Sequence, residues 1–186
     1  GAEEDAAVAA AQGALDAFPD LYEAAWRDAL AAKIGLTGDA EAGALGADLL
    51  AAMEGGEADF TLTFRGLAAL PGAQAGAGPA TDEAVRSLFI DPIAFDAWAL
   101  RWRARLAADA RPEAARRDAM RRVNPAVIPR NHRVEQALSA AHSGDLGPFN
   151  GLRAALAAPY EDQPDGAPLT LPPRPEEEVR RTFCGT

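Results

Sequence analysis

Apolar side chains recur every three or four residues along most of this chain, which is the spacing of one face of an α-helix. No segment alternates apolar and polar residues over the length of a useful β-strand. We therefore predict an all-α fold, an irregular multi-helix bundle over residues 1–158. An extended, Pro-rich tail should follow over residues 159–186, because six of the 14 prolines fall there and no apolar period continues.

The hydrophobic pattern divides the N-terminal part into two helices. A weak helix over residues 3–17 should end at Phe18-Pro19-Asp20, because proline removes a hydrogen bond from a helix interior. A second helix should then bury one face and stop at a glycine. The residues of that face are Tyr22, Trp26, Ala29, Leu30 and Ile34, and the stop is Gly35.

Later helices are marked by their first and last residues. Short polar side chains that can cap a helix N-terminus stand before four apolar stripes, and each cap should contribute about 1 kcal/mol. These caps are Asp39, Asp59, Asn131 and Asp145; Gly55-Gly56 and Gly144 are expected stops, and Asp91-Pro92 and Arg111-Pro112 are expected starts. Pro125 should end a helix at Val123, because it biases Asn124 out of the helical region. Residues 71–80 are rich in Gly and Pro and predict a flexible surface loop.

One stripe is richer in aromatic residues than the others and should form the centre of the core. It contains Phe95, Trp98, Trp102 and Leu106, while Arg101, Arg103 and Arg105 occupy the opposite face. Two Trp side chains of roughly 150–250 Å² each must be buried against something. Two further stripes predict inward faces late in the chain: Val134, Ala137, Leu138 and Ala141, then Leu146, Phe149, Leu152 and Leu156.

Charge and cysteine usage narrow the choice of partners and compartment. The net charge of −10 argues against nucleic acid and anionic membranes as partners, and no apolar run approaches the roughly 20 residues of a membrane span. Residues 101–133 nevertheless hold 10 of the 18 basic residues, a belt that serves either an acidic partner, another part of the protein, or a solvated helix face. Cys184 is the one cysteine, which favours a reducing, cytoplasmic setting.

Catalytic machinery is not visible in this sequence. It contains neither glycine-rich phosphate loop pattern, and two histidines with one cysteine cannot form a four-ligand Cys/His zinc site. We therefore predict no catalytic, cofactor-binding or metal-binding residue in the chain. His132 should be a hydrogen-bonding residue at a helix start, and His142 should lie near a helix C-terminus. Asp82 and Glu83 should form a carboxylate pair in a first helical turn, and Glu176 to Glu178 should form a solvated run.

Four short segments of the chain resemble a known family in their order and spacing. They are Asp59-Phe60-Thr61 with Phe64-Arg65, residues 122–132 (RVNPAVIPRNH), residues 159–164 (PYEDQP), and the terminal Cys184-Gly185-Thr186. From about Leu21 to Thr186 the chain resembles the C-terminal region of the SelO family, also called YdiU. The opening Gly-Ala without Met adds to the expectation that the chain is a piece of a longer protein.

The resemblance implies a kinase-like parent protein that binds ATP with Mg²⁺ or Mn²⁺ and transfers AMP to Ser, Thr or Tyr hydroxyls of proteins. The family's nucleotide- and metal-binding residues lie upstream of the matched region, so none is assigned to this chain. Its partners would be the upstream kinase-like domain and the protein substrates of the parent. The chain itself would be a scaffolding or regulatory region without activity; the alternative is an independent helical protein-interaction module.

Two groups of residues could carry such a role. Cys184, on a tail, could form a regulatory disulfide with a cysteine of the upstream domain; an inert exposed thiol is the alternative. The other group could fix a helix–helix connection or contact the upstream domain, the protein substrate or ATP phosphates: Asn124, Pro125, Arg130, Asn131, His132 and Arg133.

Overall fold

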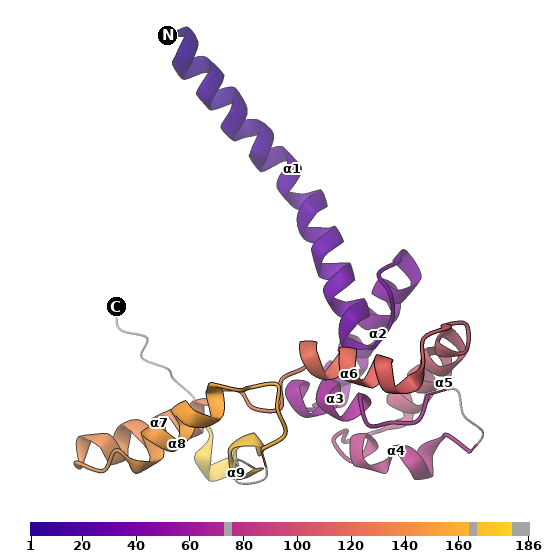
Figure 1. Ribbon diagram of the computed structural model, residues 1–186, viewed down its shortest axis with the longest axis vertical. Coiled ribbons are helices and arrows are strands. Elements are labelled where there is room, and N and C mark those ends of the chain that lie inside the picture. The colour runs from indigo at the N-terminus through magenta and orange to yellow at the C-terminus, as the bar shows by residue number, and fades with distance from the viewer. Residues whose placement is uncertain (73–75, 164–166, 180–186) are drawn as a thin grey trace.

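The computed structural model describes residues 1–72, 76–163 and 167–179, and within these ranges every regular element is helical. In chain order the elements are α1 (Ala2–Lys33), α2 (Ala40–Gly55), α3 (Phe60–Leu67), α4 (Pro79–Arg86), α5 (Ile93–Ala107), α6 (Glu113–Val123), α7 (Asn131–His142), α8 (Gly147–Leu156), α9 (Ala167–Thr170) and the short 3-10 helix η2 (Pro175–Glu177). Figure 1 shows α2 to α6 gathered around the C-terminal end of α1, while α7 and α8 form a separate pair. The predicted all-α class is confirmed for the described residues.

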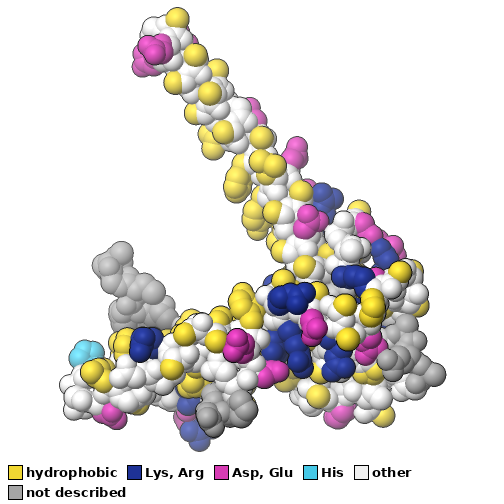
Figure 2. All heavy atoms as spheres, in the orientation of Figure 1, with side chains coloured by type: hydrophobic (Ala, Val, Ile, Leu, Met, Phe, Trp, Pro, Cys, Tyr) yellow, Lys and Arg dark blue, Asp and Glu magenta, His cyan; other side chains and the backbone are white. Residues whose placement is uncertain are grey.

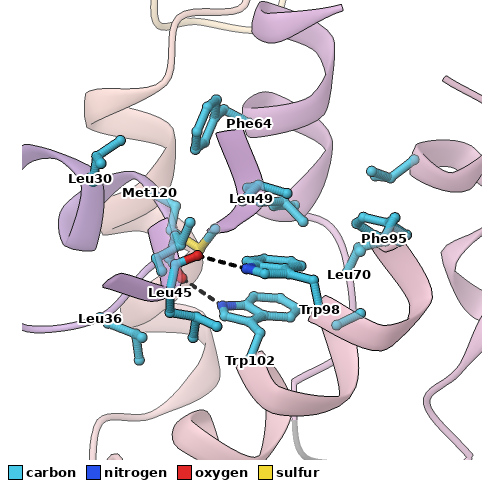
Figure 3. Packing of buried hydrophobic residues seen from close by; sticks show 14 of the residues in the cluster. Leu30, Leu36, Leu45, Leu49, Phe64, Leu70, Phe95, Trp98, Trp102 and Met120 are labelled. Carbon is cyan, nitrogen blue, oxygen red and sulfur yellow. Dashed lines mark hydrogen bonds between the residues drawn. The ribbon is translucent and has the colours of Figure 1, made fainter. Parts of the chain in front are cut away.

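The two tryptophans of α5 form the centre of the hydrophobic core, as their spacing predicted. Trp98 and Trp102 are almost fully buried, and their rings stack with centroids 5.5 Å apart. The Trp98 indole N–H donates to the carbonyl oxygen of Leu45 at 2.8 Å, and that of Trp102 donates to Ile34 at 2.8 Å (Figure 3). Each ring therefore fills the core and also ties α5 to the backbone of α2 or to the end of α1.

Helix α1 differs from its prediction in two ways. It runs without interruption through Pro19, because the residues around this proline are exposed and water can bond the freed carbonyl. Its predicted inward face is also wrong for Tyr22, Trp26 and Ala29, which are exposed. Only the last turns of α1 pack on the body, where Leu30 and Ala31 are the buried residues of the helix. Close approach there requires Gly46 of α2, since a Cβ at this position would lie 2.8 Å from the Leu30 Cβ.

Two of the four predicted caps are confirmed. Asp39 and Asp59 accept hydrogen bonds from the backbone N–H groups of Ala42 and Leu62, at 2.7 and 2.8 Å. The prediction for Asn131 is wrong, because Arg130 precedes α7 in an extended conformation and Asn131 is the first helical residue. The prediction for Asp145 is wrong in position: Leu146 is the N-cap of α8, although the Asp145 carboxylate accepts from the Gly147 N–H at 2.8 Å.

The α7–α8 pair buries less apolar surface than its stripes predicted. Leu138, Leu146 and Phe149 are exposed, while Ala137 and Leu152 are buried between the two helices. The physical reason is that α7 and α8 pack mainly on each other, so each has only one covered face. The predicted stops at Gly35 and Gly144 are confirmed, and both residues have positive φ.

The predicted first-turn pair of Asp82 and Glu83 lies at the start of α4, with Asp82 in the first turn and Glu83 one residue beyond it. Glu83 is exposed, but Asp82 is 1% exposed and accepts a hydrogen bond from the Arg103 guanidinium at 2.6 Å. Arg103 was predicted on the outward face of α5, yet its side chain is buried and also bonds the carbonyl of Pro71. Its guanidinium lies 5.7 Å from the centroid of the Trp102 ring, so the paired charge and the aromatic core are contiguous.

The basic belt of residues 101–133 is used largely within the chain. Its intramolecular acceptors are Asp48 for Arg101, Asp39 for Arg105, Asp109 for Arg111, the Ala68 carbonyl for Arg117 and Asp59 for Arg130. Figure 2 shows dark blue Lys and Arg side chains interspersed with magenta acidic ones over the body. Of the three predicted uses of the belt, these contacts therefore support the second, contact with another part of the protein, which here lies within the same chain.

Replacing Trp102 by Phe tests the core assignment. The change removes the indole N–H, leaves the buried Ile34 carbonyl without its donor and opens a small cavity. We expect the free energy of unfolding to fall by roughly 2–4 kcal/mol in urea titrations. The matched control is Trp26→Phe on exposed α1, which should change it by less than about 0.5 kcal/mol. Equal effects of the two substitutions would contradict this account of the core.

Candidate functional site

A polar junction joins helix ends that are distant in the sequence. We call it the motif junction, and it consists of Lys33, Asp59, Arg65, Asn124, Arg130 and Asp162. Five of these residues belong to three of the four segments that carry the family resemblance. The structure therefore brings three of those segments together, and the fourth, at Cys184, lies outside the described residues.

Asn124 holds the end of α6 against the end of α1. Its side chain is fully buried; the amide Nδ2 donates to the Lys33 carbonyl oxygen at 2.8 Å, and Oδ1 accepts from Lys33 Nζ at 3.2 Å. The backbone of Asn124 is extended (φ −116°, ψ 104°), as the following Pro125 predicted. Because a buried amide needs partners for both its ends, Asn124 fixes the position of the two helices to one another.

Lys33 completes this contact from the α1 side. Its ammonium donates to the carbonyl of Val123, the last residue of α6, at 3.3 Å, where a cation is favoured by the helix dipole. It also lies 5.5 and 5.3 Å from the ring centroids of Phe60 and Phe64. Burial lowers the pKa of Lys33 from its usual value. The Lys33 ammonium therefore contacts a carbonyl oxygen at the end of α6 and two aromatic rings of α3.

Arg65 connects α3 to both other segments. Its Nη1 donates to the carbonyl oxygens of Arg121 and Asn124 at 3.1 and 3.0 Å, and its Nη2 donates to Asp162 Oδ1 at 2.6 Å. The hydrogen bond from Arg65 lowers the pKa of Asp162. One guanidinium thus joins α3, the C-terminus of α6 and the start of the tail, a task that suits the planar fork of five donors.

Arg130 and Asp59 form the least exposed ion pair of the junction. The bond is bidentate, with Nη1 to Oδ2 at 2.7 Å and Nη2 to Oδ1 at 3.1 Å, and the Arg130 side chain is 8% exposed. Burial alone would raise the pKa of Asp59, but hydrogen bonds from Arg130 and the Leu62 N–H outweigh it and lower that pKa. The same carboxylate therefore caps α3 and anchors the residue that precedes α7.

The start of the predicted tail is held by the backbone. The N–H groups of Ala126 and Val127 donate to the Pro159 carbonyl at 2.7 and 3.2 Å. The Gln163 amide donates to the carbonyls of Ala155 and Ala158 at the end of α8, at 2.9 and 2.8 Å. Residues 159–163 are therefore part of the folded body, although we predicted that the change of character would begin at Pro159.

His132 lies in the first turn of α7, at a helix start as predicted, and its side chain is buried. It is 3% exposed, and among the described residues no hydrogen-bond partner reaches its Nε2. Burial, followed by the nearby Arg133, lowers the pKa of His132 and favours the neutral ring. The ring borders a hollow of about 480 Å³ together with Pro173 and Glu178. His132 therefore acts as a packed core residue, while His142 ends α7 as predicted.

Asn131 and Arg133 contribute less to the junction than the sequence suggested. Asn131 is exposed at the start of α7. Arg133 donates to Gln136 Oε1 and to the Pro168 carbonyl, both at 2.9 Å, and so links α7 to α9. Within the described part of the chain, the hydrogen bonds of Arg133 do not reach the Arg130–Asp59 pair.

The junction joins helix ends through ion pairs and amide hydrogen bonds. Over residues 1–72, 76–163 and 167–179, no three His, Cys, Asp or Glu side chains converge as a metal site. None of the helices in these ranges is long and apolar enough to cross a membrane. Most side-chain polar groups of the junction are paired within the chain, whereas Arg130 Nε is buried without a partner among the described residues. The paired carboxylates of Asp59 and Asp162 do not form a ligand set for the Mg²⁺ or Mn²⁺ that the resemblance implies for the parent. No catalytic step is assigned to them.

Sequence reasoning missed two partners of the predicted residues. Lys33 lies 91 positions from Asn124, and Asp162 lies 97 positions from Arg65. No local spacing could connect such residues. Arg65 and Asp162 both lie inside segments that resemble the family. The sequence therefore singled out both residues, but it did not show that they pair.

Together, the fold and the junction define an all-helical domain whose helix ends are fixed by buried ion pairs and amide hydrogen bonds. The chain belongs to the SelO family, since the family model described as "Protein adenylyltransferase SelO" matches residues 6–157. Relatives named "Protein nucleotidyltransferase YdiU" are 52% identical in a strain of Methylorubrum extorquens and 49% identical in a strain of Rhodopseudomonas palustris, each over 99% of this chain. The chain spans 38% and 37% of the length of these two relatives.

Arg130→Ala tests the junction. The substitution leaves the partly buried Asp59 carboxylate without its bidentate partner, so we expect the free energy of unfolding to fall by about 3 kcal/mol. Arg133→Ala is the matched control, because this more exposed arginine bonds neutral acceptors, and it should cost less than about 1 kcal/mol. Chemical denaturation of both variants measures the difference, and a smaller loss for Arg130→Ala than for Arg133→Ala would refute the assignment.

The Asp59 pKa gives a second, pH-dependent test. Because the folded pKa lies below the unfolded value, the ionised carboxylate stabilises the protein above about pH 4 and this stabilisation is lost as the pH falls through the folded pKa. Asp59→Asn should therefore lower the free energy of unfolding at neutral pH, and its gap to the wild type should shrink in acid. When Arg130 is already replaced by Ala, Asp59→Asn should lower the free energy of unfolding at neutral pH by less than it does in the wild type. A gap that widens below pH 4 would show that the sign is wrong.

Proposed function

We propose that this chain is the C-terminal helical region of a SelO-type protein adenylyltransferase. The proposal rests on the family match over residues 6–157 and on relatives named as protein nucleotidyltransferases. In the proposed reaction a Ser, Thr or Tyr hydroxyl of a protein substrate attacks the α-phosphorus of ATP. The new bond joins AMP to the protein, and pyrophosphate leaves. ATP and Mg²⁺ or Mn²⁺ would be held by the kinase-like part of the parent protein, in a cytoplasmic setting.

Within such a protein we propose that this chain is a scaffold without activity of its own. The observation that carries this proposal is the motif junction. Arg65, Asn124 and Arg130 belong to the segments that most resemble the family, and their polar groups are bound to other parts of the same chain. Residues arranged in this way fix helix ends, which supports a scaffolding role.

AMP transfer separates the two parts of the proposal. With labelled ATP and Mg²⁺ or Mn²⁺, the full-length parent should label protein hydroxyls, and residues 1–186 alone should transfer none. The Arg130→Ala parent should lose stability but retain its turnover per folded molecule, because the guanidinium is paired with Asp59 and holds the start of α7 in place. Label transfer by the isolated chain would sink the scaffold role, and a kcat loss without a stability loss would place Arg130 at the active site.

A further inference from the structure

Helix α1 carries an apolar stripe that nothing in the described structure covers. Val8, Leu15, Phe18, Tyr22 and Trp26 are 39–68% exposed. Their spacings of seven, three, four and four residues place them on one face of the helix. The rings of Phe18 and Tyr22 stack with centroids 5.9 Å apart. Figure 2 shows hydrophobic side chains along the edge of α1 that faces the angle between this helix and the α7–α8 pair.

This stripe belongs to a helix that needs support. Only its C-terminal turns pack on the body, and Pro19 interrupts its hydrogen-bond ladder near the middle. Most helices in proteins are stabilised by packing of an apolar face against another element. A long helix with an interior proline and an unpartnered aromatic face is therefore a docking element, and the question is which surface it meets.

Charge argues against a second copy of α1 as the occupant. Residues 2–33 contain seven acidic and two basic side chains, and at helical spacing Asp16 and Glu23 flank the stripe along the edge that carries Val8 and Trp26. Two such helices would bring like charges together, in a chain whose net charge is already −10. An apolar groove with basic side chains along its rim would complement both the stripe and its acidic flanks.

Length favours an occupant within the parent polypeptide. The chain spans 37–38% of the two relatives described above, so more than half of each relative lies outside the region matched here. We propose that the α1 stripe docks in an apolar, basic-rimmed groove of the kinase-like part of the same polypeptide. This proposal rests on the proposed function, because it takes the catalytic part of the parent as the occupant.

Amide hydrogen exchange of α1 tests the docking in two contexts. In residues 1–186 alone, the amides of residues 5–25 should exchange rapidly; in the full-length parent they should exchange roughly tenfold or more slowly. The double substitution Leu15→Glu and Phe18→Glu should abolish this protection in the parent. The matched control, Ala9→Glu and Ala17→Glu, adds the same charge to exposed positions on the other side of the helix and should preserve it. Both pairs should leave the melting temperature of residues 1–186 unchanged, which separates lost docking from misfolding.

The possible outcomes are distinct. Equal exchange of α1 in both contexts overturns the proposal, and so does protection in the isolated chain that rises with its concentration, because a second copy would then be the occupant. Equal loss of protection in the two variant pairs also overturns it. If α1 is protected by the upstream part but the parent transfers no AMP, the proposed activity fails and the docking stands. If the parent transfers AMP while α1 stays unprotected, the docking alone fails.

Discussion

The buried amide of Asn124 is the constraint on which the rest of this architecture depends. Pro125 forces Asn124 out of the helical region, so α6 must end there, and the amide then bonds the last turn of α1 from both of its ends. That contact positions Lys33 against Phe60 and Phe64 of α3. It also presents the Asn124 carbonyl to Arg65, which holds the tail through Asp162. Because an unpaired buried amide is costly, these segments are held in one arrangement.

The core and the motif junction stabilise the fold by different interactions. Trp98 and Trp102 bury large apolar surfaces and also donate to backbone carbonyls, so one helix orders two others. The junction buries little apolar area, and its contribution is positional: bidentate and charge-assisted bonds specify how helix ends meet. Arg103 adds a paired charge at the edge of the core itself, since its guanidinium bonds Asp82 while it packs near Trp102.

Local signals predicted much of the fold because local physics determines it. The caps at Asp39 and Asp59 and the break at Pro125 depend on neighbouring residues only. Predictions failed where tertiary context decides. Periodicity marks the apolar face of a helix but cannot say whether that face meets a partner in the same chain, so Trp26 and Phe149 were expected inside. For the same reason the partners of Arg65 and Asn124, more than 90 residues away in the cases of Asp162 and Lys33, could not be paired from sequence.

The exposed face of α1 and the buried face of α5 show how similar patterns lead to different roles. Both helices repeat large apolar residues at helical spacing, and α5 satisfies its stripe within the chain because α2 and α4 pack on it and Ile34, just after α1, accepts from Trp102. For most of its length α1 has no neighbour in the described structure, although its last turns contribute Leu30 to the same core. The last turns of α1 therefore lie in the core of this chain, while the rest of the helix is exposed. Any surface that covers its exposed part is connected, through Lys33 and Asn124, to the positions of α6 and α3, so docking along α1 would orient the whole helical domain.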